Sequence, residues 1–340
     1  MSLPVVIICL AYLIMDPFKV VYDYDIYCAP GSPSYISINR SMVSQKMFDK
    51  YHDFYHWNSY VFGGSRSLYF RYDIWQPYLD DTCSITHMDG FNESLYSVYH
   101  KIKYINGKTP IDNALLCIDE DLLYKTVNEL EPLSCITPDL DPNFSYFEQQ
   151  TFYLSAFMRK PLVAIAYTYY RLSGKVKPWV VRLGEFDTTI RYYDIRHNED
   201  VNMIEVKNLP DSLIYNDTRM VMFYQRPNYQ VYGQKVIDTT ALRMLTEIKE
   251  IFEANNTDYK VIVNPTYNQK KLSLDDQQIL ESLFGDRLYD YSGVNFITQD
   301  YHNYSDNLHF RKHVARQILK WIYEDNAHTI PEGQTDFDKF

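Results

Sequence analysis

The sequence predicts an α/β protein in which a parallel sheet carries helices on both faces. Short apolar runs of strand length, such as Ala114–Ile118 and Tyr259–Val263, end in polar loops. Amphipathic segments of helix length, such as Ala241–Ala254, alternate with these runs along the chain. A short apolar run in such a setting is typical of a buried parallel strand. Strands that alternate with helices at this spacing indicate a parallel sheet between two helical layers.

The first predicted elements lie in the N-terminal part of the chain. Residues 16–50 hold three prolines and are expected to form an irregular lead-in. A strand is predicted over Asn58–Phe62, ending at two glycines, with a helix after it. The apolar positions of Asn92–Ile105 fall on one side of a helix, and Ala114–Ile118 follows as a buried strand.

Residues 130–240 have a different pattern and are predicted to be an insertion or a cap. Phe147–Leu172 is long, aromatic and helical in pattern, with a break at Pro161. Three later stretches alternate as antiparallel strands do, and they are Trp179–Leu183, Thr188–Ile195 and Asn202–Val206.

The regular alternation returns after residue 240. Helices are predicted over Ala241–Ala254, Gln277–Phe284 and Phe310–Tyr323, and strands over Tyr259–Val263 and Val294–Ile297. In parallel sheets of this kind, ligands bind at the carboxyl ends of the strands. The loops that follow the predicted strands are therefore where a functional site is expected.

Composition and charge exclude several classes of function. The chain has 340 residues, which suits one large α/β domain with an insertion, or two domains. With 33 basic and 44 acidic residues its net charge is −11, so binding to a nucleic-acid backbone is not expected. The sequence contains no phosphate-binding glycine loop and no zinc or calcium motif, so we expect no cofactor and no metal.

Tyrosine is unusually abundant, with 33 residues. A ring with a hydrogen-bonding tip suits sugar faces and wet interfaces. An aromatic-rich core would account for the same number, and the sequence leaves both explanations open. The five cysteines have no metal-binding or CxxC spacing and do not fix the redox compartment.

The N-terminal segment Met1–Met15 is apolar and carries no charged side chain. Its length is short of the ~20 residues that span a bilayer. We expect a truncated membrane anchor, which would place residues 16–340 outside the cytoplasm. The alternative is a buried helix or strand that belongs to the core.

The loop after the first predicted strand holds a candidate nucleophile, Ser65. Gly63 and Gly64 permit a tight turn, which leaves the serine at the start of a helix with its hydroxyl accessible. A nucleophilic serine needs such an accessible hydroxyl and a backbone N–H directed at the oxyanion. A serine that only caps the helix would give the same local pattern.

A second candidate loop precedes the final predicted helix and contains Asp306 and His309. Two residues three apart lie on one face of a helical turn, so the carboxylate is expected to reach Nδ1 of the imidazole. Asp306 would then orient His309 to accept the proton of Ser65. If this is so, the serine hydroxyl and the imidazole should lie within about 3–4 Å of each other.

The two loops together resemble the SGNH/GDSL hydrolase superfamily, in which a GDS- or GSSR-like block and a terminal DxxH supply the catalytic groups. The closest resemblance is to membrane-anchored SGNH-like proteins of bacterial surface-polysaccharide loci. It covers about residues 16–125 and 240–325. The matching blocks are Asp16-Pro17-Phe18-Lys19, Gly63-Gly64-Ser65-Arg66, Asp290-Tyr291-Ser292-Gly293, Asn303-Tyr304 and Asp306-Asn307-Leu308-His309.

This resemblance implies a three-layer α/β/α, flavodoxin-like fold, SGNH hydrolase-like in topology, with the middle region inserted. It also implies further oxyanion or substrate contacts, for which Gly64, Gly90 and Asn92 are the candidates. The family's GxND block is replaced by Ile118-Asp119-Glu120-Asp121. Asn264, at the end of another strand, is the candidate for the missing side-chain amide.

By this resemblance we expect a serine esterase or O-acyltransferase acting on acyl (acetyl) esters of a cell-surface polysaccharide. It would be anchored outside the cytoplasm, with a membrane O-acyltransferase as partner. Two alternatives stay open. The acidic residues in place of GxND favour a catalytically impaired protein that binds or assembles polysaccharide. An intracellular esterase, with Met1–Met15 as part of its core, is the weaker alternative.

Overall fold

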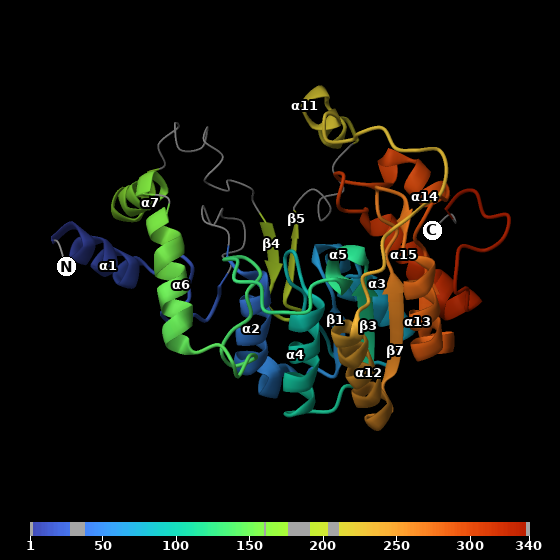
Figure 1. Cartoon of the computed structure of the whole chain (residues 1–340), viewed down its shortest axis with the longest axis horizontal. Coiled ribbons are helices and arrows are strands. Elements are labelled where there is room, and N and C mark those ends of the chain that lie inside the picture. Colours follow the sequence, from blue (N-terminus) through green and yellow to red (C-terminus); the bar gives the residue numbers. More distant parts are fainter. Residues whose placement is uncertain (1–2, 28–37, 160, 176–190, 203–210, 338–340) are drawn as a thin grey trace.

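In the computed structural model, five parallel strands form a central sheet between two helical layers (Figure 1). The structure describes residues 3–27, 38–159, 161–175, 191–202 and 211–337. The strand order is β2-β1-β3-β7-β9, with every neighbouring pair parallel. The α/β class with a parallel sheet and three layers is therefore confirmed.

The central strands are short, and β1, β3 and β7 match predicted strands whereas β2 and β9 were not predicted. The central strands are β1 (Ser59–Phe62), β2 (Ile85–His87), β3 (Asn113–Ile118), β7 (Asp258–Val263) and β9 (Leu288–Asp290). Four further strands form two small ribbons outside the sheet, namely β4 (Arg191–Asp194) with β5 (Glu199–Asn202), and β6 (Val231–Tyr232) with β8 (Lys270–Lys271).

Long helices and short helical turns connect the strands. The long helices are α1 (Leu3–Met15), α2 (Arg40–Tyr55), α4 (Leu95–Asn106), α6 (Tyr146–Arg159), α7 (Pro161–Ser173), α12 (Thr239–Ala254), α13 (Leu274–Phe284) and α15 (Lys312–Lys320). The short ones are η1 (Ser65–Tyr69), α3 (Tyr72–Trp75), η2 (Gln76–Tyr78), α5 (Glu120–Leu123), α10 (Asp211–Ile214), α11 (Asp217–Met220), η3 (Gly285–Arg287), α14 (Phe296–Gln299), η4 (Tyr301–Asn303) and η5 (Trp321–Asp325).

Each face of the sheet has its own hydrophobic core, because successive side chains of a strand point to opposite faces. In β3, Ala114, Leu116 and Ile118 pack with α2, α4, α12 and α13. Leu115 and Cys117 of the same strand pack on the other face with η1, α3, α14 and α15. This division explains why the strand is apolar at nearly every position.

Most predicted elements agree with the structure, and two differ. The irregular lead-in predicted over 16–50 contains helix α2 from Arg40 onward. Its buried side mixes the apolar Met42, Val43, Met47 and Phe48 with four polar residues, which weakens the apolar stripe in the sequence. The strand predicted over Val294–Ile297 is wrong, because β9 lies earlier and Phe296 begins helix α14.

The middle region forms helices and an antiparallel hairpin outside the sheet. The helical stretch divides at Pro161, the first residue of α7, where proline needs no N–H donor. Strands β4 and β5 pair antiparallel. Strand β4 lies within the predicted Thr188–Ile195, whereas β5 precedes the predicted Asn202–Val206 and shares only Asn202 with it. The stretch Trp179–Leu183 lies outside the described residues, as do parts of the other two predicted strands.

The N-terminal segment forms helix α1, which packs against α6 and α7 rather than on the sheet (Figure 1). Tyr12 and Met15 are buried in that contact, whereas Ile7, Leu10 and Ile14 are exposed. Among the described residues, no helix combines the length and apolarity that crossing a membrane requires.

Candidate active site

The candidate site lies where β1 and β3 end, at the carboxyl edge of the sheet. Strand β2 lies on one side of β1 and strand β3 lies on the other. The strand order therefore reverses direction between β1 and β3. Parallel sheets bind their ligands at such switch points. Ser65 follows β1 and Asp119 follows β3.

Ser65 and His309, which are 244 residues apart in sequence, meet in this region. Ser65 Oγ lies 2.7 Å from His309 Nε2, a hydrogen-bond distance. His309 Nδ1 lies 2.9 Å from both carboxylate oxygens of Asp306. The expected proximity of the serine and the imidazole is therefore confirmed, and the acid, the imidazole and the hydroxyl form one continuous chain.

Asp306 is held in place by its own loop. Its Oδ1 accepts hydrogen bonds from the N–H groups of Leu308 and His309. Burial raises the pKa of the Asp306 carboxyl, but the hydrogen bonds and the neighbouring imidazole outweigh it, so this pKa lies below its ordinary value. The carboxylate is the form of Asp306 that orients His309.

The local structure of this loop differs from the prediction. Asp306 and His309 were expected on a helical turn that opens the final helix, but α15 begins only at Lys312. The two residues lie instead in a bent loop that is closed by a bridge between Tyr304 and Phe310. The three-residue spacing still brings them together, because Asp306 folds back onto the backbone N–H groups that follow it.

Gly63 permits the turn that presents Ser65. Its φ is +142°, a conformation that side chains disfavour, and a Cβ there would lie 2.6 Å from the carbonyl oxygen of Cys117. Gly64 precedes η1, and its carbonyl accepts hydrogen bonds from the N–H and hydroxyl of Ser67. Ser65 is the first residue of η1, and its N–H donates to no acceptor among the described residues.

Arg66 connects three loops of the site. Its Nε donates to the carbonyl of Leu308, next to His309. One terminal nitrogen lies 2.6 Å from Asp119 Oδ2, and the other 3.4 Å from Asp121 Oδ2. The guanidinium therefore joins the loop of the serine to the loop of the histidine, and its charge balances the acidic residues after β3.

Replacing Arg66 by Gln is expected to slow acylation of Ser65 by roughly ten- to a hundredfold, because small displacements of a catalytic group cost this much. The rate constant for labelling of Ser65 by a fluorophosphonate measures the effect. Asp121→Asn is the matched control, since that carboxylate is exposed and more distant. An Arg66→Gln rate equal to wild type would contradict the positioning role of this guanidinium.

Buried ion pairs fix the loop that contains Gly90. Arg40 of α2 pairs with Asp89, and Lys101 of α4 pairs with Glu93, all of them buried. A Cβ on Gly90 would collide with the Glu93 carboxylate, so this position requires glycine. The Gly90 N–H donates to the carbonyl of Gly63 at 3.1 Å. This differs from the expectation, because the donor is engaged within the protein rather than directed at an oxyanion.

Asn92 and Asn264 also differ from their predicted roles. Asn92 is exposed, with φ +51°, and its side-chain and backbone carbonyls accept hydrogen bonds from Lys125. Asn264 is buried, and its Nδ2 donates to the Ile118 carbonyl, while Oδ1 has no partner in the described part of the chain. The structure shows neither side-chain amide in contact with Ser65.

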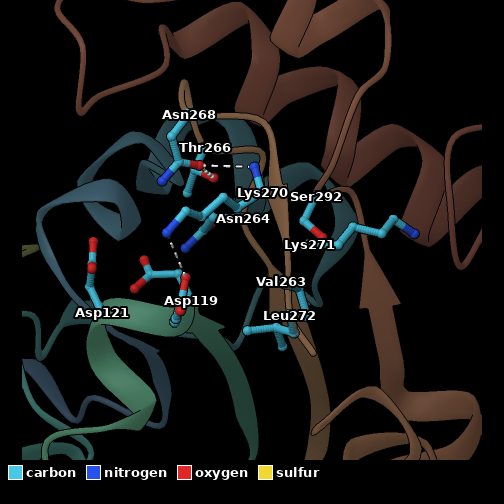
Figure 2. A pocket seen from close by; sticks show the side chains of 11 residues that line it. Asp119, Asp121, Val263, Asn264, Thr266, Asn268, Lys270, Lys271, Leu272 and Ser292 are labelled. Carbon is cyan, nitrogen blue, oxygen red and sulfur yellow. Dashed lines mark hydrogen bonds and ion pairs between the residues drawn. The ribbon is translucent and has the colours of Figure 1, made fainter. Parts of the chain in front are cut away.

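Asn264 lines a small cavity of about 20 Å³ at the ends of β3 and β7. Figure 2 shows Asp119 and Asp121 on one side of it, with Asn264 and Lys270 across. A cavity of this size admits only a water-sized group. The residues that line this cavity do not include Ser65 or His309, so the cavity is separate from the contact between these two side chains.

Two other aspartates close in sequence to Asp306, namely Asp290 and Asp300, have different partners. Asp300 contacts His302, and Asp290 accepts hydrogen bonds from Ser292. His52 of α2 stacks on Phe48 of the same helix. Within the described ranges, no group of three or more potential ligands is arranged to hold a metal ion.

Sequence reasoning missed Arg66 and the contacts that the middle region makes with the site. Tyr215 donates to the carbonyl of Tyr304, and Arg219 donates to the carbonyl of Ser305, so both hold the loop of His309. Glu199 of β5 accepts from the N–H of Tyr72, just after η1. Of these residues, only Arg66 could have been predicted from the sequence. It directly follows Ser65, and the predicted neighbouring strand ends in an acidic loop with which a basic side chain could pair.

No family model, curated protein or solved structure matches this chain.

Proposed function

We propose that the protein is an SGNH-like serine esterase or O-acyltransferase, with Ser65 as nucleophile, His309 as general base and acid, and Asp306 as the orienting carboxylate. The observation that carries this proposal is the 2.7 Å contact between Ser65 Oγ and His309 Nε2, with Asp306 on the other ring nitrogen. A hydroxyl bonded to an imidazole that a carboxylate orients is the arrangement that activates serine.

In the proposed reaction, Ser65 Oγ attacks the acyl carbonyl as its proton passes to His309 Nε2. The ester oxygen then leaves with that proton, and the acyl group stays on Ser65. Water or a sugar hydroxyl next gives its proton to His309 and attacks the acyl carbonyl. His309 then returns a proton to Ser65 Oγ as the bond between Oγ and the acyl carbon breaks, which regenerates the serine. Water gives hydrolysis and a sugar hydroxyl gives transfer, through the same acyl-serine.

The Ser65 N–H is the proposed oxyanion donor. The Gly90 N–H would join it only after its hydrogen bond to Gly63 is broken. The carboxylates of Asp119 and Asp121 lie near this region, but Arg66 contacts both and reduces their repulsion of a developing negative charge. The acidic loop is thus compatible with the proposed chemistry.

A fluorophosphonate probe tests the proposal, since it forms an adduct only with an activated serine. We expect mass mapping to locate one adduct on Ser65 in the native protein and none in protein unfolded before labelling. Ser67 and Ser305 serve as internal controls, because neither contacts an imidazole side chain through its hydroxyl among the described residues. Native protein without an adduct at Ser65 would overturn the proposal.

The second candidate function is a catalytically impaired protein that binds or assembles polysaccharide. The engaged Gly90 N–H favours it, because losing one oxyanion donor lowers rates by about 10²–10³. A folded protein that gives no adduct yet binds glycan would support this candidate in place of the enzyme.

The substrate class and location belong to the same proposal. We propose acyl esters of a cell-surface polysaccharide as substrate and a membrane O-acyltransferase as partner. The protein would lie outside the cytoplasm, attached to the membrane through its N-terminal segment. The resemblance of the blocks around Ser65 and Asp306 and the apolar Met1–Met15 segment support these assignments.

A further inference from the structure

Helices α1, α6 and α7 form a unit of their own beside the sheet. They contact one another around a separate hydrophobic cluster that includes Tyr12, Tyr153 and Tyr167. Figure 1 shows α1 and α7 together at one end of the molecule, opposite the end that carries α13 and α14. This unit contributes no residue to the contacts among Ser65, His309 and Asp306.

Both outer helices of this unit expose a stripe of large apolar side chains. On α1 these are Ile7, Leu10 and Ile14, and on α7 they are Leu162, Ile165, Tyr169 and Leu172. Ile14 is 73% exposed and Leu172 is 83% exposed. Residues three or four apart share one face of a helix, so each helix has an apolar outer face. Adjacent exposed apolar faces of this kind mark an interaction surface.

The segment of sequence that contains α7 is basic, although the whole chain is acidic. Helix α1 carries no charged side chain. From Gln149 to Gly184 the sequence has six basic residues and no acidic one, in a chain of net charge −11. Arg171 and Lys175 are exposed at the end of α7, next to three tyrosines of that helix. Tyrosine and basic side chains beside an apolar helix face are typical of a helix that lies at a lipid–water interface.

We propose that the outer faces of α1 and α7 together lie on an anionic lipid bilayer. The apolar stripes would enter the boundary between headgroups and acyl chains, and the basic residues would face the anionic headgroups. The proposal goes beyond attachment by the N-terminal segment, because it adds a second membrane contact by α7, which follows α1 by about 150 residues in the sequence. It does not depend on the chemistry of Ser65.

A second copy of the chain fits this surface less well. A two-fold symmetric contact places the same patch on both sides, so basic residues of one copy would oppose those of the other. An anionic bilayer offers apolar and negatively charged groups at once, which this surface matches on both counts.

Vesicle flotation tests the proposal with the full chain. Wild type is expected to float with vesicles of phosphatidylcholine mixed with phosphatidylglycerol, and less with phosphatidylcholine alone. The double variant Ile165→Glu/Leu172→Glu, with α1 intact, is expected to bind at least about tenfold more weakly, since two apolar anchors are lost. The control Val221→Glu/Leu274→Glu changes two exposed apolar residues outside the unit and should bind as wild type does. Circular dichroism melts confirm that all variants are folded.

Three results would overturn the proposal. The first is wild type that does not bind the mixed vesicles, and the second is a double variant of α7 that binds them as wild type does. The third is a dimer in light scattering that the double variant converts to monomer, without vesicle binding, which would assign the surface to a second copy. Labelling of Ser65 is expected to be unchanged in the double variant, so failure here is distinct from failure of the enzymatic proposal.

Discussion

Replacing His309 by alanine is expected to lower the rate constant for acylation of Ser65 by about 10⁶-fold, the scale at which removing a triad base acts. The reason is the contact between Ser65 Oγ and His309 Nε2, because His309 is the base placed to receive the serine proton. Without the base, the neutral hydroxyl is a weak nucleophile at neutral pH. The second-order rate constant of fluorophosphonate labelling, with Ser65→Ala as background, measures the effect.

Adding imidazole to the buffer distinguishes loss of the base from a purely structural effect of the His309→Ala substitution. In the His309→Ala variant imidazole can enter the space left by the side chain and accept the proton, so labelling should partly recover as imidazole rises. His302→Ala is the matched control, since His302 also contacts an aspartate in a neighbouring turn but has no contact with Ser65. A His309→Ala rate equal to wild type would exclude His309 as the base.

Replacing Asp306 by asparagine is expected to lower the same rate constant by about 10⁴-fold. An asparagine can still accept the backbone hydrogen bonds of Leu308 and His309 through Oδ1. Its Nδ2 would then face His309 Nδ1 as a donor, which leaves the proton on Nε2. That tautomer cannot accept a proton from Ser65. Asp300→Asn, which alters the neighbouring Asp–His pair, is the matched control and should label at the wild-type rate.

The same substitution has a pH-dependent effect on stability. Because the pKa of Asp306 is lower in the folded protein than in the unfolded chain, its ionisation stabilises the fold above about pH 4, the ordinary carboxyl value. This contribution disappears as pH falls through the lower folded pKa. The free energy of unfolding of Asp306→Asn should thus fall below that of wild type at pH 7, with a gap that narrows below pH 4. A constant gap from pH 7 to pH 3 would contradict this assignment.

The central strands were predictable because burial on both faces demands apolar residues at nearly every position. Strand β3 is apolar at every position after Asn113, and β7 at every position except Asp258 and Lys260. Strand β2 has three residues, too few to form a pattern. Helix α2 was missed for a different reason. Arg40 lies on its buried side and is satisfied by Asp89 and Asn198, which are distant in sequence. Polar burial that depends on remote partners leaves no local signal.

The candidate site shows the same division between local and remote information. Gly63 and the spacing of Asp306 and His309 are local features, and they pointed to side chains that do meet. The hydrogen bond of Gly90 depends on how closely two loops approach, to within a fraction of an ångström. The sequence carries no measure of that distance, so the engaged N–H was not foreseeable.

The contacts of the middle region matter for any shortened version of the protein. Glu199 secures the segment after η1, while Tyr215 and Arg219 secure the loop of His309, and all three lie in the inserted part of the chain. A chain trimmed of residues 130–240 would lose these contacts. We therefore expect the loops of Ser65 and His309 to be less firmly held in such a chain and fluorophosphonate labelling of Ser65 to be slower than in the whole protein.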